Sequence, residues 1–236
     1  MSERALPRIA LPRIALPRIA IVSAGVGHLA LDAIGQALRS LPPGQAWVQL
    51  RDHQASDELI GRAARQLRPL LDDQRTPLII NRTIELAIAC DADGVHLAEA
   101  MSQGSELERR RRDLASSRQP NLLLGTSRHN AKSAKFAQKI ADYVMLGPIW
   151  PTIGKPNAIG LEALAEAAAG PQNKHQTTTR QGLLFAIGGI KSPSRAKRAI
   201  VAGADGIAGI RAFNQSTIAE IAKAVLPAVD SRSPTS

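Results

Sequence analysis

The chain has 236 residues, a length that fits one α/β barrel or two smaller domains. Hydrophobic residues make up 44% of it and charged residues 21%, which excludes a wholly disordered chain. Aromatic residues make up only 3%, so few side chains could stack on bases, and we expect no nucleic-acid partner. Part of the net charge of +10 comes from four consecutive arginines at 109–112, which we interpret as a solvated helix end or loop.

The chain has one cysteine, which excludes an internal disulfide and a cysteine-based zinc site. Its apolar surroundings predict that Cys90 is a buried structural thiol. No apolar run reaches the roughly 18 residues of a transmembrane helix, and prolines interrupt the N-terminal segment, which therefore lacks the apolar centre of a signal peptide. We expect a cytoplasmic protein with no membrane partner.

Residues 5–20 read ALPRIALPRIALPRIA, with a period of five that fits neither a helix nor a strand. The prolines in this segment prevent a continuous helix. We predict a repeat-bearing extension at 1–15 that is extended or mobile, a barrel at 16–230, and a tail at 231–236.

From residue 18 onward, strand-like and helix-like segments alternate. Apolar runs predict eight strands, at 18–23, 46–51, 77–82, 94–97, 121–127, 143–150, 183–190 and 206–213. Helical patterns lie at 29–41, 56–74, 83–91, 130–141, 161–170, 192–203 and 216–229. The polar segments 102–120 and 171–182 are predicted to be loops.

This alternation predicts an α/β fold, a single (β/α)8 TIM barrel. Three predicted helix-to-strand joints share an Ala-Asp turn (CDADGVHL, IADYVMLG and AGADGIAG), which supports repeated strand–helix units. An open doubly wound sheet is the alternative, although no GxGxxG follows the first strand as a dinucleotide-binding sheet would require.

Polar side chains follow the predicted strands, at the barrel end where the sites of TIM-barrel enzymes form. Gln49, Arg51 and His53 share one face because side chains alternate along a strand. Gly188 and Gly189 precede a helix, and their bare backbone predicts a phosphate-binding loop. The other candidates are Asn81, Arg82, His96, Ser127, His129, Thr152 and Lys155.

A set of motifs occurs in a fixed order: VQLRDH, PLIIN, DGVHL, GTSRH, DYVMLGPIWPTIGK, AIGGI and GADGIAGI. Together they resemble the thiamine phosphate synthase/TenI superfamily over about residues 18–213, and the ending GIAGIRAF is also similar to the synthase-like half of Nudix fusion proteins. The resemblance implies an enzyme that joins hydroxymethylpyrimidine pyrophosphate to thiazole phosphate and releases pyrophosphate. Phosphorylated small molecules are then its substrates.

The resemblance also implies a role for each candidate. We expect Ser127, Lys155 and His129 to be catalytic. We expect the remaining candidates to bind substrate, with the glycine pair at the thiazole phosphate: Gln49, Arg51, His53, Asn81, Arg82, His96, Thr152, Gly188 and Gly189.

The chain departs from the family at the metal site. The resemblance implies Mg²⁺, which prefers carboxylate oxygens, but Arg82 and Met101 stand where two aspartates are expected. We therefore predict no metal ligand. Two alternatives stay open: a metal-independent TenI-like thiazole phosphate tautomerase, and a non-catalytic barrel that binds a phosphorylated ligand. The tautomerase carries a catalytic histidine in the loop at 147–157, here called the flap, where this chain has Pro148. The sequence leaves a monomer and a homodimer open.

Overall fold

The structure, a computed structural model, describes residues 16–169, 182–209 and 215–226. It confirms the predicted barrel, because eight parallel strands close in chain order and β1 pairs with both β2 and β8. The strands are β1 (Ile19–Val22), β2 (Ala46–Leu50), β3 (Leu78–Ile80), β4 (Gly94–Leu97), β5 (Leu123–Arg128), β6 (Tyr143–Leu146), β7 (Leu183–Ile187) and β8 (Gly206–Gly209). The predicted extension at 1–15, the tail at 231–236, most of the loop at 171–182 and the end of the last predicted strand lie outside the described residues.

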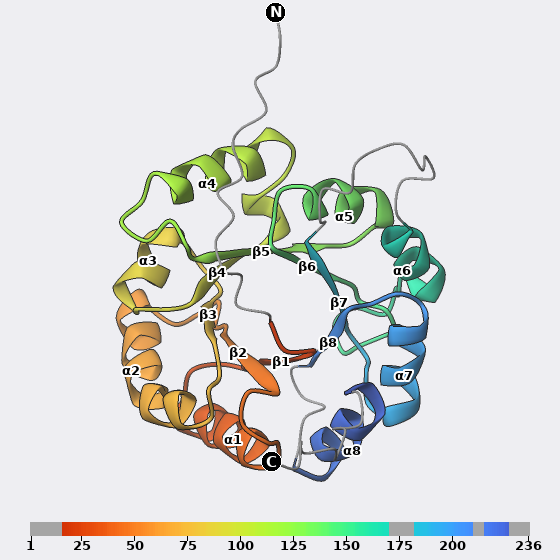
Figure 1. Cartoon of the computed structure of the whole chain (residues 1–236), viewed down its shortest axis with the longest axis horizontal. Coiled ribbons are helices and arrows are strands. Elements are labelled where there is room, and N and C mark those ends of the chain that lie inside the picture. Colours follow the sequence, from red (N-terminus) through yellow and green to blue (C-terminus); the bar gives the residue numbers. More distant parts are fainter. Residues whose placement is uncertain (1–15, 170–181, 210–214, 227–236) are drawn as a thin grey trace, which may run out of the picture.

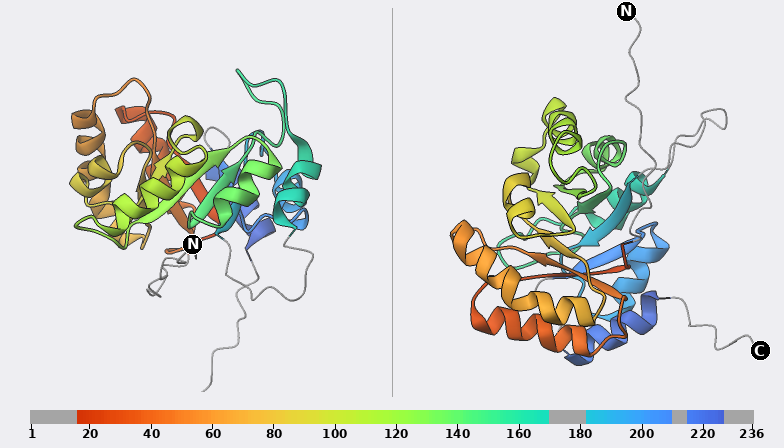
Figure 2. Two further views of the ribbon diagram at one scale, coloured as in Figure 1. Left: turned by 90° about the horizontal axis from the view of Figure 1, so that it is seen from above. Right: turned by 60° about the vertical axis from the view of Figure 1, so that its left-hand side comes forward.

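The helices form a ring around the strands (Figure 1). They are α1 (His28–Arg39), α2 (Asp57–Asp73), α3 (Ile84–Ala89), α4 (Ser105–Ala115), α5 (Ala131–Gln138), α6 (Gly160–Ala168), α7 (Pro193–Val201) and α8 (Gln215–Val225), with a short 3₁₀ helix η1 (Glu99–Met101) after β4. Figure 2 shows from two further directions that the helices stay on the outside of the barrel. No helix in the described part is long and apolar enough to cross a membrane.

Alternating residues of each strand divide the core into two layers. One face of each strand packs against the helices, and the other fills the lumen of the barrel. In the lumen the Trp47 ring lies edge-on to Tyr143 and Phe185, with ring centroids 5.0 and 5.3 Å apart. These three rings are fully buried and fill the barrel, so a site can form only at its ends.

The three Ala-Asp joints have the same geometry. The Oδ2 atoms of Asp93, Asp142 and Asp205 each accept a hydrogen bond from the backbone N–H of the preceding strand, at Leu78, Leu124 and Leu184. Each aspartate also donates its own N–H to the carbonyl of the same leucine at 2.8 Å. The aspartates therefore join neighbouring strands at the end of the barrel opposite the site.

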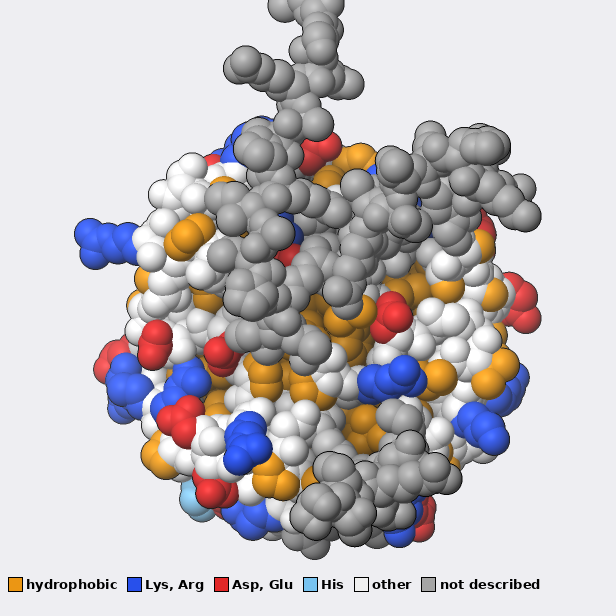
Figure 3. Space-filling view, in the orientation of Figure 1, with side chains coloured by type: hydrophobic (Ala, Val, Ile, Leu, Met, Phe, Trp, Pro, Cys, Tyr) orange, Lys and Arg blue, Asp and Glu red, His pale blue; other side chains and the backbone are white. Residues whose placement is uncertain are grey.

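The prediction of a loop at 102–120 was wrong, because this segment contains α4. Its helical pattern was hidden, since only Leu107 and Leu114 are buried and all the other residues except Ala115 are polar. Ion pairs one turn apart support the helix instead, from Arg109 and Arg110 to Glu106. The arginine run is thus largely paired. On the face of the molecule shown in Figure 3, charged side chains lie around the edge and hydrophobic side chains lie nearer the middle.

Candidate functional site

Four predicted site residues come from four neighbouring strands. Gln49, His96 and Ser127 lie on β2, β4 and β5, and Asn81 directly follows β3. The strands are parallel, so these residues meet at the carboxyl end of the barrel. The structure thus brings to one end of the barrel four residues that were expected to bind substrate or to act in catalysis.

His96 is the centre of a buried polar chain. Its Nε2 lies 2.8 Å from the Ser127 hydroxyl, and its Nδ1 lies 3.0 Å from the hydroxyl of Tyr143. Burial lowers the pKa of His96 to about 3, and the positive charges of Arg51 and Arg128 act in the same direction. The imidazole is therefore neutral at ordinary pH and unsuited to act as a cation toward a phosphate.

Gln49 is 1% exposed, and its Oε1 atom is buried without a hydrogen-bond partner in the described part of the chain. A buried acceptor without a partner is costly, so this atom is available to a donor on a ligand.

Ser23 connects the end of β1 to the residue that follows β2, because its hydroxyl accepts the Arg51 N–H at 2.7 Å. Arg51 is thereby held at the rim of the barrel.

Arg82 stabilises a loop. Its guanidinium donates to the Asp52 carbonyl at 2.8 Å and to the Ala55 carbonyl, and it lies 3.7 Å from the Asp57 carboxylate. His53 lies exposed in the same loop, and its pKa is lowered, first of all by the charge of Arg51. The substrate contacts expected of Arg82 and His53 stay predictions.

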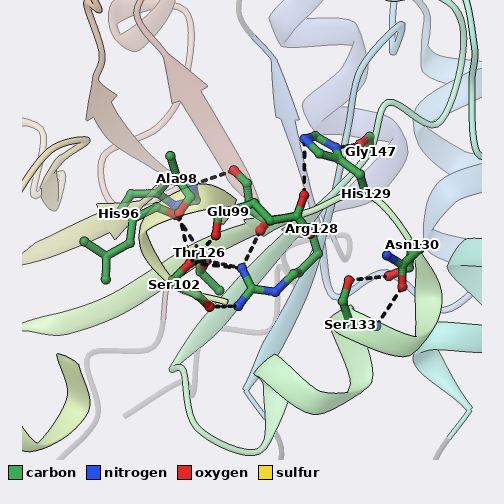
Figure 4. A network of polar contacts seen from close by, with 12 residues as sticks. His96, Ala98, Glu99, Ser102, Thr126, Arg128, His129, Asn130, Ser133 and Gly147 are labelled. Carbon is green, nitrogen blue, oxygen red and sulfur yellow. Dashed lines mark hydrogen bonds and ion pairs between the residues drawn. The ribbon is translucent and has the colours of Figure 1, made fainter. Parts of the chain in front are cut away.

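Arg128 is a buried structural residue that was not among the candidates predicted from the sequence. It is 2% exposed and donates to the Ser102 carbonyl at 2.5 Å, to the Thr126 hydroxyl at 2.6 Å and to the Ser127 carbonyl at 2.6 Å (Figure 4). In the described part of the chain it forms no ion pair. The sequence offered one signal of this role. Side chains alternate along β5, so Arg128 points outward, to the face that the helices cover. Arg128 fastens the segment after β4 to β5.

His129 lies beside a carboxylate. Its Nδ1 contacts the Gly147 carbonyl, and its Nε2 lies 3.9 Å from Oε2 of Glu99 (Figure 4). Asn130, which follows it, caps α5 through the Ser133 N–H. The structure thus places a histidine ring and a carboxylate side by side at this end of the barrel.

The glycine pair carries the flap that follows β6. The N–H groups of Ile149 and Trp150 donate to the carbonyls of Ile187 and Gly188 at 2.9 and 3.2 Å. The φ angles of Gly188 and Gly189 are +98° and +68°, and a Cβ on Gly188 would lie 2.6 Å from the Pro148 Cα atom. The bare backbone is therefore required for this packing, and its contact with a phosphate stays a prediction.

Thr152 and Lys155 close a tight turn in the flap, with two reciprocal backbone hydrogen bonds of 3.0 Å. Lys155 is exposed. In the described part of the chain no polar contact joins either residue to the side chains of β2–β5. The structure thus places them on a separate segment from the His96 chain.

The side chains at this end of the barrel do not fit Mg²⁺. Asp52 accepts N–H bonds from Gln54, Ala55 and Val26, and these bonds, that from Gln54 first, lower its pKa. Asp57 lies 3.7 Å from the guanidinium of Arg82. Among the described carboxylates at this end of the barrel, Glu99 is then the one that is bonded neither to backbone N–H groups nor to an arginine. The described residues contain no group of three or more His, Cys, Asp or Glu able to hold a metal. Mg²⁺ prefers several hard oxygen ligands.

Comparison with known proteins identifies the family of this chain. The TMP-TENI family model, described as thiamine monophosphate synthase, matches residues 20–213. The chain belongs to this family. The matched range runs from β1 through β8 and includes every predicted site residue.

Relatives and solved structures agree with this family. The chain is 37% identical to the thiamine-phosphate synthase of Geobacillus thermodenitrificans, over 69% of this chain and 68% of that one. It is 32% identical to the enzyme of the same name from Shouchella clausii, over 76% and 80% of the two chains. The solved thiamine phosphate pyrophosphorylase of Pyrococcus furiosus is 25% identical, with a TM-score of 0.69 over 88% of this chain and 95% of that one.

Proposed function

We propose that this family member is a thiamine-phosphate synthase-like transferase that joins hydroxymethylpyrimidine pyrophosphate to thiazole phosphate. The thiazole nitrogen attacks the methylene carbon of the pyrimidine, a C–N bond forms, and the C–O bond to pyrophosphate breaks. The observation that carries the proposal is the set of polar groups from β2–β5 at one end of a filled barrel, with Ser127 bound to His96 and the Gln49 oxygen lacking a partner.

The protein's own residues then bind and orient two phosphorylated substrates. Arg51 supplies positive charge where negative charge develops on the leaving pyrophosphate, the main electrostatic requirement of such a step. Ser127 supplies a hydroxyl from β5, and Lys155 brings an ammonium from the flap. The Gly188-Gly189 backbone, at the start of the segment leading to α7, binds the phosphate of the thiazole.

We propose no step that uses a divalent metal. The carboxylates near the site are bonded to backbone N–H groups or to Arg82, apart from Glu99. Arginine and lysine bind phosphate oxygens directly. We expect the chain to be less dependent on Mg²⁺ than an enzyme with a carboxylate site. The cytoplasmic location and the choice between monomer and homodimer stay predictions from the sequence.

The test is an assay with both substrates, each substrate alone as a control, and parallel samples with Mg²⁺ or with a chelator. The proposal predicts thiamine phosphate and pyrophosphate in equal amounts, only when both substrates are present, and with at most a partial loss in chelator. No product at high enzyme concentration would overturn the synthase proposal. Complete loss of product in chelator would overturn only the expectation about the metal.

One observation favours a second candidate, a metal-independent thiazole phosphate tautomerase. His129 lies 3.9 Å from Glu99 at this end of the barrel, and a histidine paired with a carboxylate can remove a proton and return it elsewhere. Proton exchange into thiazole phosphate, followed by NMR in D₂O, tests this candidate. Exchange that persists in H129Q would exclude His129 as its base.

A further inference from the structure

Tyr143 reaches His96 across a strand that lies between them. His96 is on β4 and Tyr143 on β6, and the strand pairing aligns both with Gly125 of β5. A Cβ atom on Gly125 would lie only 1.9 Å from the Cζ atom of Tyr143. The phenol ring therefore occupies the space above Gly125, and this glycine permits the 3.0 Å contact between the tyrosine hydroxyl and Nδ1 of His96.

The hydrogen bonds of this chain can run in two directions. In one, Tyr143 donates to Nδ1 of His96, and Nε2–H donates to the Ser127 oxygen. In the other, Ser127 donates to Nε2, and Nδ1–H donates to the Tyr143 oxygen. Only in the second direction would the neutral histidine act as a base toward the serine hydroxyl.

Burial decides between the two directions. Tyr143 is 0% exposed, and His96 is its only hydrogen-bond partner among the described residues. If Tyr143 accepted from His96, its own O–H would be buried without an acceptor, at a cost of about 1–3 kcal/mol. The Oε1 atom of Gln49 does not relieve this, because it has no hydrogen-bond partner among the described residues.

We infer that Tyr143 is a positioning residue: it donates to Nδ1, holds His96 as the Nε2–H tautomer, and makes Ser127 a hydrogen-bond donor toward the ligand. The Ser127 oxygen accepts from His96, and its proton is then free to point toward the partly exposed end of the barrel. Ser127 in this arrangement is not an activated nucleophile. Resting on the proposed function, the ligand group at Ser127 is an acceptor, such as a pyrophosphate oxygen or a ring nitrogen.

The test reads the tautomer directly, by long-range ¹H–¹⁵N NMR on full-length protein with ¹⁵N-labelled histidine. The spectrum of H96Q identifies the His96 signals by their loss. The wild type is expected to show a single His96 form with the proton on Nε2. A wild-type His96 proton on Nδ1 would overturn the inference by itself, whatever the tyrosine and serine variants show.

Two variants test the role of the tyrosine. Y143F removes the donor to Nδ1, and we expect a second His96 form with the proton on Nδ1 to appear. S127A is the matched control, because Tyr143 still donates to Nδ1 and the Nε2–H form is expected to persist. An unchanged single form in Y143F would show that Tyr143 does not set the tautomer. The readout needs no substrate, so a failure of the synthase proposal would leave the NMR result interpretable.

Discussion

The Nε2 atom of His96 lies 2.8 Å from the hydroxyl of Ser127, where β4 and β5 reach the carboxyl end of the barrel. The histidine is buried and neutral, while the serine is partly exposed. This contact connects the filled lumen to the candidate site. It links the stability of the barrel to the chemistry proposed for its end.

S127A is expected to lower kcat/KM for the joining reaction roughly 10- to 100-fold, the usual effect of losing one hydrogen bond to a charged group. The loss follows because no other hydroxyl on β5 faces the same side, since Thr126 points outward and donates to the Leu97 carbonyl. Steady-state kinetics with both substrates measure it. S133A, a change in the α5 cap, is the control, and an equal loss in that variant would contradict a local role for Ser127.

The neutral state of His96 predicts a pH dependence of stability. Its folded pKa of about 3 lies below its ordinary value of 6.5, so the unfolded chain takes up a proton that the folded chain does not. Stability should therefore fall as the pH drops from about 6.5 toward 3, by at most about 1.4 kcal/mol per pH unit.

Urea unfolding between pH 4.5 and 8 measures this slope. The H96Q variant is expected to be less stable overall but to have a shallower slope. H53N is the control, because His53 is exposed and contributes less in the same direction. A slope in H96Q equal to that of the wild type would show that His96 is not buried in its neutral form.

Substitution of Gly188 by alanine should displace the flap. The residue has φ +98°, and its new Cβ would lie 2.6 Å from Pro148. We expect destabilisation by about 1–3 kcal/mol and weaker binding of thiazole phosphate. Thermal melts and calorimetric titration measure the two effects. G27A is the control, because a Cβ there meets nothing within 4 Å. Unchanged phosphate affinity in G188A would count against the phosphate loop.

Loss of Arg128 should destabilise the barrel. R128M leaves the carbonyls of Ser102 and Ser127 without their donor, so we expect the free energy of unfolding to fall by about 3 kcal/mol. Chemical denaturation measures the change, and R112M, on the exposed side of α4, is the control. If both variants lost the same small amount, Arg128 would not hold the segment after β4.

Much of this molecule was predictable from local patterns. The eight apolar runs and the helical patterns between them predicted the order of strands and helices, because such patterns depend on neighbours along the chain. Helix α4 was missed because ion pairs rather than an apolar face support it. The arrangement of Tyr143, Gly125 and His96 was also beyond prediction, since it depends on the register of three strands.

The side chains were harder to predict than the backbone. From the sequence, Arg82 was expected to bind substrate, and Arg128 was not singled out. In the structure each is bonded to backbone carbonyls, and only their folded neighbours reveal that role. A charged residue after a strand therefore identifies the end of the barrel but not its own partner.

Both phosphorylated substrates are proposed to meet at the carboxyl end of this barrel. A crystal structure with thiamine phosphate and pyrophosphate bound would test this placement. We expect the pyrimidine and pyrophosphate beside Ser127 and Arg51, and the thiazole phosphate against the backbone of Gly188 and Gly189. Ligands on the outer surface between helices, or no binding at saturating concentrations, would contradict it.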